Sequence, residues 1–242
     1  ATDVVLDYTA GRVITLGNTY SPVLSTSTTL QIPVNVLYGP TSDDSAEAWL
    51  TCYMWQDKLR HIAVGMKVRA LQMNMRSGAP VSMTVTLVGV LVSRDQAVSR
   101  PAGYTPVTRT PPAWLAGLSR LNRVLAQAGT VTFDAGLRAP PIENPESTQG
   151  YDPANITGAS PRLTLDPYSH SSNTPTRSTA FQNQTEIPYF AAWGSTAGNR
   201  FLFSFPGGVI QDLNSTERNE LGVDQIILVG NKPGANFFLA CY

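Results

Sequence analysis

Histidines are the side chains that first suggest catalysis. The sequence has two, His61 and His170, and either imidazole could act as a general base near neutral pH. A base needs a nucleophile beside it, and neither histidine lies in a recognised arrangement with one. The sequence also lacks G-x-S-x-G, H-E-x-x-H, G-x-x-x-x-G-K and the dinucleotide-binding glycine pattern. We therefore expect no catalytic residues, no enzymatic activity and no cofactor.

Carboxylates and cysteines give no stronger signal. Asp43 and Asp44 are adjacent, but acids before a predicted helix are more simply N-terminal caps than a hydrolytic pair. The two cysteines are Cys52 and Cys241, and we expect free buried thiols rather than a disulfide, because nothing else is typical of a disulfide-rich secreted scaffold. So few cysteines and histidines also predict no metal site.

The charge balance favours association. Charged residues make up 14% of the 242 residues, and 17 basic side chains balance 17 acidic ones. This share is well below the usual value of about 25%. Since little repulsion keeps copies apart, we expect the chain to associate readily.

No basic arm is present, so contact with nucleic acid should be weak or confined to a patch. No stretch approaches the ~18 apolar residues of a membrane span.

Apolar periodicity predicts many short strands. Residues 66–75 and 81–92 alternate apolar and polar side chains, with a break of phase near residues 71–73 that a bulge would restore. In the second strand, Val81, Met83, Val85 and Leu87 are expected to face inward. Further strands are predicted at residues 31–38, 130–133, 181–190, 200–205 and 224–242, the last broken at 230–234.

Helices are predicted in two connections. Residues 46–59 follow a capping box from Asp44 to Glu47, although the same residues would also fit a strand. Residues 113–128 carry apolar side chains at helical spacing and end before Gly129. Residues 136–180 are rich in Pro, Asn, Ser and Thr and predict a long loop, and residues 1–30 predict an extended arm. This inventory is typical of an antiparallel β-sandwich.

Residues 185–193, T-E-I-P-Y-F-A-A-W, place a proline inside a strand-like segment. Proline has no N–H to donate to a ladder, so it belongs at a sheet edge, at a bulge or where a strand stops pairing. The aromatic residues beside it would then be free to reach another molecule.

The segment Q-T-E-I-P-Y-F at residues 184–190 resembles the E-x-P-Y segment that ends the seventh strand in capsid subunits of picorna-like positive-strand RNA viruses. The order of predicted elements is similar to that family, and D-Q-I-I-L-V-G and N-F-F-L-A-C-Y are similar to its last strand. The sequence departs from the family in lacking the P-P-G turn, and H-I-A-V-G-M-K-V-R matches its basic Arg-Gly segment only loosely.

The resemblance implies an eight-stranded antiparallel jelly-roll sandwich over residues 31–242, with short helices in the connections. It implies a structural subunit of a non-enveloped icosahedral capsid, in the virion and in the host cytoplasm during assembly. Its partners would be other capsid subunits, viral RNA inside the shell and a host receptor. Ala1 and Tyr242 would be ends released from a polyprotein, although methionine removal or trimming also explains Ala1.

The same resemblance assigns Glu186, Pro188, Tyr189, Phe190 and Trp193 to a strand end and subunit interface. Alanine at Tyr189 and Phe190 is then expected to impair assembly more than folding. The alternatives are a lectin-like or other ligand-binding β-sandwich, which would stop at a small oligomer, and a β-sandwich hydrolase, which would depend on His61 or His170.

Overall fold

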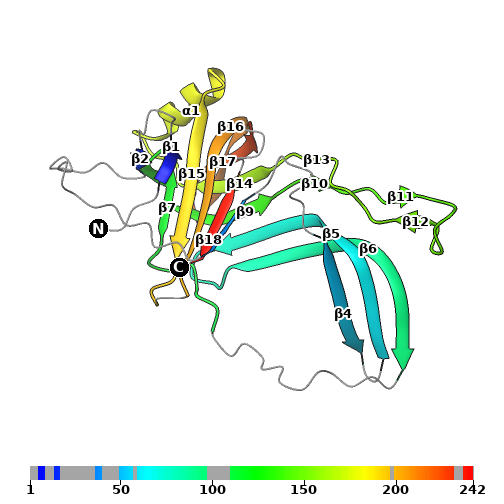
Figure 1. Ribbon diagram of the computed structural model, residues 1–242. Coiled ribbons are helices and arrows are strands. Elements are labelled where there is room, and N and C mark those ends of the chain that lie inside the picture. The colour runs from blue at the N-terminus through cyan, green and yellow to red at the C-terminus, as the bar shows by residue number, and fades with distance from the viewer. Residues whose placement is uncertain are drawn as a thin grey trace.

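The described part of the chain is mostly β-structure (Figure 1). The computed structural model describes residues 5–8, 14–16, 36–39, 49–56, 59–96, 110–196, 199–231 and 237–241. Most of residues 1–30, which were predicted as an extended N-terminal segment, lie outside these residues, so the division at residue 30 stays a prediction. The paired strands are antiparallel, which confirms the predicted all-β class with antiparallel, sandwich-like sheets.

One large sheet contains most of the strands. Its strands follow the order β4-β5-β9-β14-β17-β16-β15-β7-β8, with β6 beside β5, β18 beside β16 and β3 beside β18. Their bounds are β3 (Val36–Tyr38), β4 (Leu50–Gln56), β5 (Leu59–Arg76), β6 (Ser82–Gln96), β7 (Leu118–Leu121), β8 (Val124–Leu125), β9 (Ala128–Asp134), β14 (Arg162–Pro167), β15 (Glu186–Trp193), β16 (Phe201–Arg218), β17 (Leu221–Gly230) and β18 (Phe238–Cys241). A separate hairpin pairs β1 (Val5–Tyr8) with β2 (Ile14–Leu16).

The sheet curls so that one face encloses the core. Phe133 on β9 lies 4.8 Å, between ring centroids, from Phe203 on β16, although β14 and β17 separate these strands in the sheet order. Phe237 also packs on Phe133, at 4.7 Å between centroids. The aromatic contact therefore joins strands that are not neighbours in the sheet. Burial of each Phe stabilises the fold by about 1.5–3 kcal/mol.

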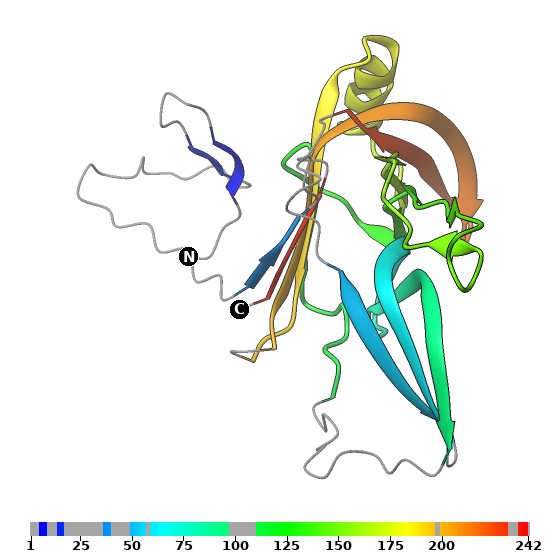
Figure 2. The ribbon, with the colours of Figure 1, turned by 45° about the vertical axis from the view of Figure 1, so that its right-hand side comes forward.

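A three-stranded extension projects from the core (Figures 1 and 2). We define it as β4, residues 59–70 of β5 and residues 86–96 of β6. Along one edge, β5 pairs with β6 over most of the length of β5. Along the other edge of β5, its first residues pair with β4 and its last residues pair with β9. Register shifts near residues 62–70 mark bulges, which bend a strand. The extension is therefore held to the core by the ladder of β5.

A second projection, which we call the arm, packs beside the extension (Figure 1). It consists of β10 (Leu137–Arg138) paired with β13 (Gly158–Ala159), and β11 (Ile142–Glu143) paired with β12 (Tyr151–Asp152). Gly65 on β5 has a φ of +59°, and a Cβ there would lie 2.7 Å from Pro153 of the arm. Glycine at this position lets the arm approach the extension closely.

Helix α1 (Thr174–Gln182) is fixed to the sheet by a buried ion pair. Nη1 of Arg177 donates to Oδ2 of Asp224 at 2.5 Å, and both side chains are buried. Desolvation raises the pKa of Asp224, but hydrogen bonds from Ser169, Arg177 and Thr174, with the charge of Arg177, outweigh it and hold that pKa below its ordinary value. The helix therefore depends on a tertiary contact.

Both predicted helices are wrong. Residues 50–56 form β4, which pairs with β5, and residues 46–48 lie outside the described part. Residues 118–125 form the hairpin of β7 and β8, because Asn122 and Arg123 adopt positive φ values of 49° and 67° and turn the chain. The predicted loop over residues 136–180 instead contains the arm, β14 and most of α1.

The predicted strands at 66–75 and 81–92 are confirmed in the longer β5 and β6, although β6 begins at Ser82. The predicted inward face is confirmed only in part, because Val81 packs against the core and Leu87 is half-buried, whereas Met83 and Val85 are exposed. The all-β class is confirmed, but the strand order does not confirm the predicted eight-stranded jelly roll.

Cys52 and Cys241 are free thiols. No helix in the described ranges is long and apolar enough to cross a membrane.

Replacing Asp224 by asparagine should destabilise the fold by about 3 kcal/mol or more, because Arg177 keeps a buried charge without its counter-ion. Chemical denaturation measures this loss. Glu217→Gln, at an exposed side chain, is the matched control and should change stability by less than about 0.5 kcal/mol.

The pair should also give a pH signature. The pKa of Asp224 is lower in the folded state than in the unfolded chain. The ionised carboxylate therefore stabilises the fold at pH values above the unfolded pKa of about 4, and this stabilisation is lost as the pH falls through the folded-state pKa. The stability difference between wild type and Asp224→Asn should thus shrink in acid. A difference that stays constant to low pH would contradict this role.

Candidate interaction surfaces

The proline of the predicted interface segment lies at a bulge, not at a strand end. Glu186–Trp193 forms β15, which pairs with β16 on one side and with β7 on the other. The register against β16 shifts between Ile187 and Tyr189, so Pro188 is accommodated without donating an N–H. Its carbonyl oxygen accepts the N–H of Asn122 at 2.8 Å. Pro188 therefore does not release the strand from the sheet.

The aromatic residues of this segment are buried inside the subunit. Tyr189 and Phe190 are both 0% exposed, and Trp193 is also buried. Tyr189 packs in the main core, where burial raises the pKa of its hydroxyl and Oγ of Ser119 lies 3.3 Å from Oη. These side chains pack within the fold, so the expectation that they reach a neighbouring molecule is wrong.

The remaining predicted positions are not brought together. Glu186 is exposed and its Oε1 accepts from Nδ2 of Asn231 at 3.2 Å. His61 lies on the extension, whereas Nδ1 of His170 lies 2.8 Å from Oγ of Ser172, beside α1. Across the described ranges no three His, Cys, Asp or Glu side chains form a metal-binding group. Ala1, Asp43, Asp44 and Tyr242 lie outside the described residues.

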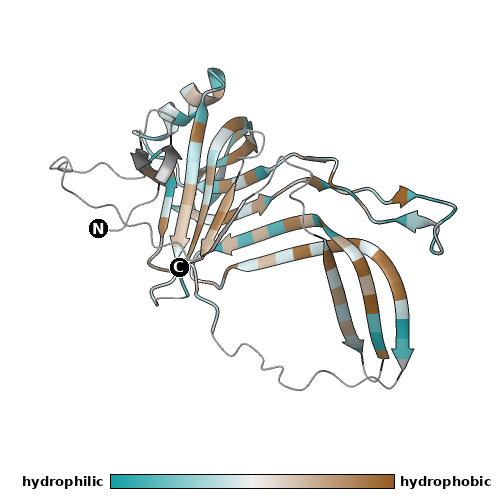
Figure 3. Ribbon diagram, viewed as in Figure 1, coloured by the Kyte–Doolittle hydropathy of each residue, from teal (hydrophilic) through white to brown (hydrophobic). Residues whose placement is uncertain are grey.

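The extension exposes large apolar side chains, which the sequence did not predict as exposed. Hydrophobic positions recur along its strands (Figure 3). The exposed apolar residues on it, or immediately before β4, are Trp49, Leu50, Tyr53, Met54, Leu59 and Val92. Tyr53 is 53% exposed and its ring stacks on Trp55 with 6.1 Å between centroids. Nζ of the buried Lys67 lies 4.5 Å from the ring centroid of Trp49. Large apolar side chains exposed together on one part of the fold make the extension a candidate interaction surface.

Polar atoms on the same extension lack hydrogen-bond partners. Nε1 of Trp55 and Nε2 of His61 are shielded from solvent and make no hydrogen bond within the described part of the chain. Buried polar groups are usually paired, and an unpaired one costs about 1–3 kcal/mol. A partner that covers the extension and offers backbone groups would remove this cost.

The extension also ends in an open sheet edge. Within the described residues, β6 pairs with β5 alone over its 15 residues. Its other edge presents ladder N–H and C=O groups to whatever lies beside it. Long open edges are templates for pairing with another chain.

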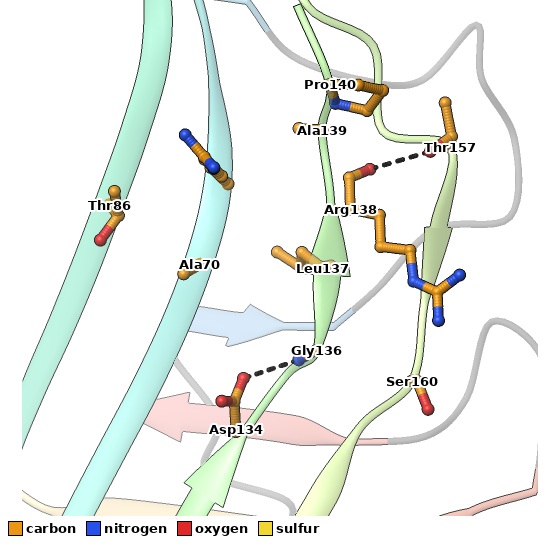
Figure 4. Close-up of a pocket in the computed structure, with 11 residues that line it drawn as sticks. Ala70, Thr86, Asp134, Gly136, Leu137, Arg138, Ala139, Pro140, Thr157 and Ser160 are labelled. Atoms are coloured by element: carbon orange, nitrogen blue, oxygen red, sulfur yellow. Dashed lines mark hydrogen bonds between the residues drawn. The ribbon is translucent and has the colours of Figure 1, made fainter.

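Two hollows lie between the extension and the arm, and we call them together the groove. Figure 4 shows the first of them. The first has a volume of about 740 Å³ and is lined by Arg69, Thr86, Asp134 and Arg138, among others. The second, of about 340 Å³, is lined largely by apolar residues that include Val88, Leu91 and Tyr151. The groove therefore has a polar half and an apolar half.

The β16–β17 hairpin ends in a turn of unusual composition. Asn219 and Glu220 have φ values of 53° and 63°, as a two-residue type I′ turn requires. Glycine is preferred at the second position, and another residue there costs roughly 1–2 kcal/mol. Glu217, Glu220 and Leu221 are all exposed around this turn, which we call the acidic tip.

Comparison with known proteins relates most of the chain to one family. A protein-family model described as phage tail tube protein matches residues 7–234. No curated protein matches the chain.

The resemblance to picorna-like capsid subunits is therefore wrong. The E-I-P-Y letters belong to a bulged and largely buried strand of this fold. The match gives no support to an icosahedral shell, enclosed RNA, a host receptor, polyprotein release or assembly in the host cytoplasm. It agrees with the coarser expectation of a structural subunit of a virus particle.

Phe190→Ala should destabilise the fold by about 3–5 kcal/mol, because a fully buried ring is replaced by a cavity. Thermal or chemical unfolding of the monomer measures this loss. Tyr53→Ala removes an exposed ring of similar size and should leave stability within about 0.5 kcal/mol of the wild type. Equal stability of the two variants would show that Phe190 is not a core residue.

Proposed function

The chain belongs to the phage tail tube protein family, and on that premise we propose that it polymerises with copies of itself into the tube of a phage tail. It acts there as a structural subunit of the virion, without enzymatic activity. Its partners are further copies of the same chain.

The extension is the observation that carries this proposal. A sheet of three strands that packs only against the arm leaves much of its surface to water unless another molecule covers it. The extension and Trp49 just before it expose six large apolar side chains, and within the described residues two shielded polar atoms lack partners and β6 has an open edge. Each of these features is unfavourable in an isolated monomer and is relieved when a second copy packs there.

The form of the contact suits a polymer. The extension and the core are different surfaces, so a contact of one copy's extension with another copy's body is heterologous. Heterologous contacts generate rings when they close and filaments when they do not. A stable contact of this kind buries roughly 1,200–2,000 Å² in total, which a projecting three-stranded sheet can supply.

Assembly of the purified chain tests the proposal. We expect sedimentation velocity to show large polymers, and negative-stain electron microscopy to show hollow tubes of uniform width. A monomer, or an oligomer that stops at a few copies, would overturn the proposal and favour a ligand-binding β-sandwich.

Introducing charge on the extension should block assembly without unfolding the subunit. Tyr53→Glu combined with Val92→Glu places two carboxylates on surface that a neighbour must desolvate. We expect tubes to be absent by microscopy while the melting temperature stays close to that of wild type.

Leu115→Glu is the matched control, because Leu115 is also exposed but lies outside the extension. This variant should still form tubes. Tubes formed equally well by the double variant would show that the extension is not an assembly surface.

A further inference from the structure

The polar half of the groove has an excess of positive charge. Arg69 and Arg138 are exposed, and within the described part of the chain neither guanidinium forms an ion pair or a side-chain hydrogen bond. The carboxylate of Asp134 is occupied: Oδ2 accepts from Nε2 of Gln72 at 3.0 Å, and Oδ1 accepts the N–H of Gly136 at 2.8 Å (Figure 4). Two arginines without ion-pair partners therefore line this hollow together with one aspartate that already has partners. Guanidinium groups in such a hollow are suited to a carboxylate.

The acidic tip carries the complementary groups. The carboxylates of Glu217 and Glu220 make no hydrogen bond or ion pair to other described residues, and both side chains are exposed. Leu221 beside them is 56% exposed. The tip thus combines two free acids with one apolar side chain, as the groove combines two free arginines with an apolar half. A glutamate also occupies the positive-φ position where glycine would fit best.

Within one subunit the acidic tip and the groove lie apart. Asp134 lines the polar half of the groove. It is paired across the sheet with Arg162 on β14, and Arg162 is paired in turn with Val229 on β17. The tip begins at Leu221, at the other end of β17. At about 3.3 Å per residue, this separation is roughly 25 Å of strand. The tip therefore needs the groove of another copy.

We propose that the groove receives the acidic tip of a second copy of this chain, with Glu217 and Glu220 meeting Arg69 and Arg138, and Leu221 meeting the apolar half. The inference rests on the proposed function, since it names one contact between copies in the polymer. A knob and a socket at opposite ends of a subunit form a heterologous contact, which repeats without closing on itself after two copies. The charges fix which end of each copy meets the next.

Two charge-reversed variants test the pairing by mixing. Glu217→Arg with Glu220→Arg gives a basic tip and leaves the groove basic. Arg69→Glu with Arg138→Glu gives an acidic groove and leaves the tip acidic. Each variant alone should raise the critical concentration for tubes at least tenfold, about 1.4 kcal/mol per contact. In an equimolar mixture each tip finds an oppositely charged groove, so the critical concentration should return to within about threefold of wild type.

Controls separate this inference from the proposed function. Circular dichroism should show that both variants are folded, since all four side chains are exposed. Arg123→Glu reverses an exposed arginine on the β7–β8 turn and should leave assembly unchanged. Variants that assemble like wild type, or that fail alone and also when mixed, would overturn the tip-in-groove contact while wild-type tubes still support the proposed function. A wild-type chain that forms no polymer would overturn both.

Discussion

The structure depends on β5, because this one strand belongs to both parts of the molecule. Its last residues pair with β9 in the core, and its first residues pair with β4 in the extension, while β6 follows it on the other side. Among the described residues, the buried core cluster contains no side chain of the extension. The backbone ladder and the bulges near residues 62–70 therefore set the direction in which the apolar extension projects, and the close approach of Pro153 at Gly65 fixes the arm beside it.

This arrangement divides stability from assembly. The core is stabilised by buried aromatic contacts such as Phe133 with Phe203, and by the Arg177–Asp224 pair that fixes α1. Under the proposed function, the exposed side chains of the extension, the open edge of β6 and the groove serve contacts between copies. The low share of charged residues fits a subunit that must associate over large surfaces.

Sequence patterns predicted the strands better than the helices. Alternation over residues 66–75 and 81–92 predicted two strands, since strand periodicity is a property of local sequence. Trp114, Leu118, Leu121 and Leu125 have helical spacing, but two consecutive positive φ values at Asn122 and Arg123 make a hairpin instead. Helix α1 gave little local signal apart from a proline in its first turn, because its main anchor, Asp224, is distant in sequence. The direction in which a strand faces also depends on whether a second layer covers it, which no local pattern contains.

The interaction surfaces were harder to predict. The pattern at residues 185–193 did identify a proline bulge as one alternative, but not the burial of its aromatic residues. The extension could not be recognised, because alternating apolar residues indicate a core face whether or not a core is present. The groove joins residues from β5, β6, β9, β10 and β12, which only the folded chain brings together.

A helical reconstruction by electron cryomicroscopy of tubes formed from the wild-type chain tests the central claim most directly. The account predicts that Tyr53, Val92 and the free edge of β6 are buried against a neighbouring copy. Tubes in which the extension lies in solvent and touches no other copy would contradict it.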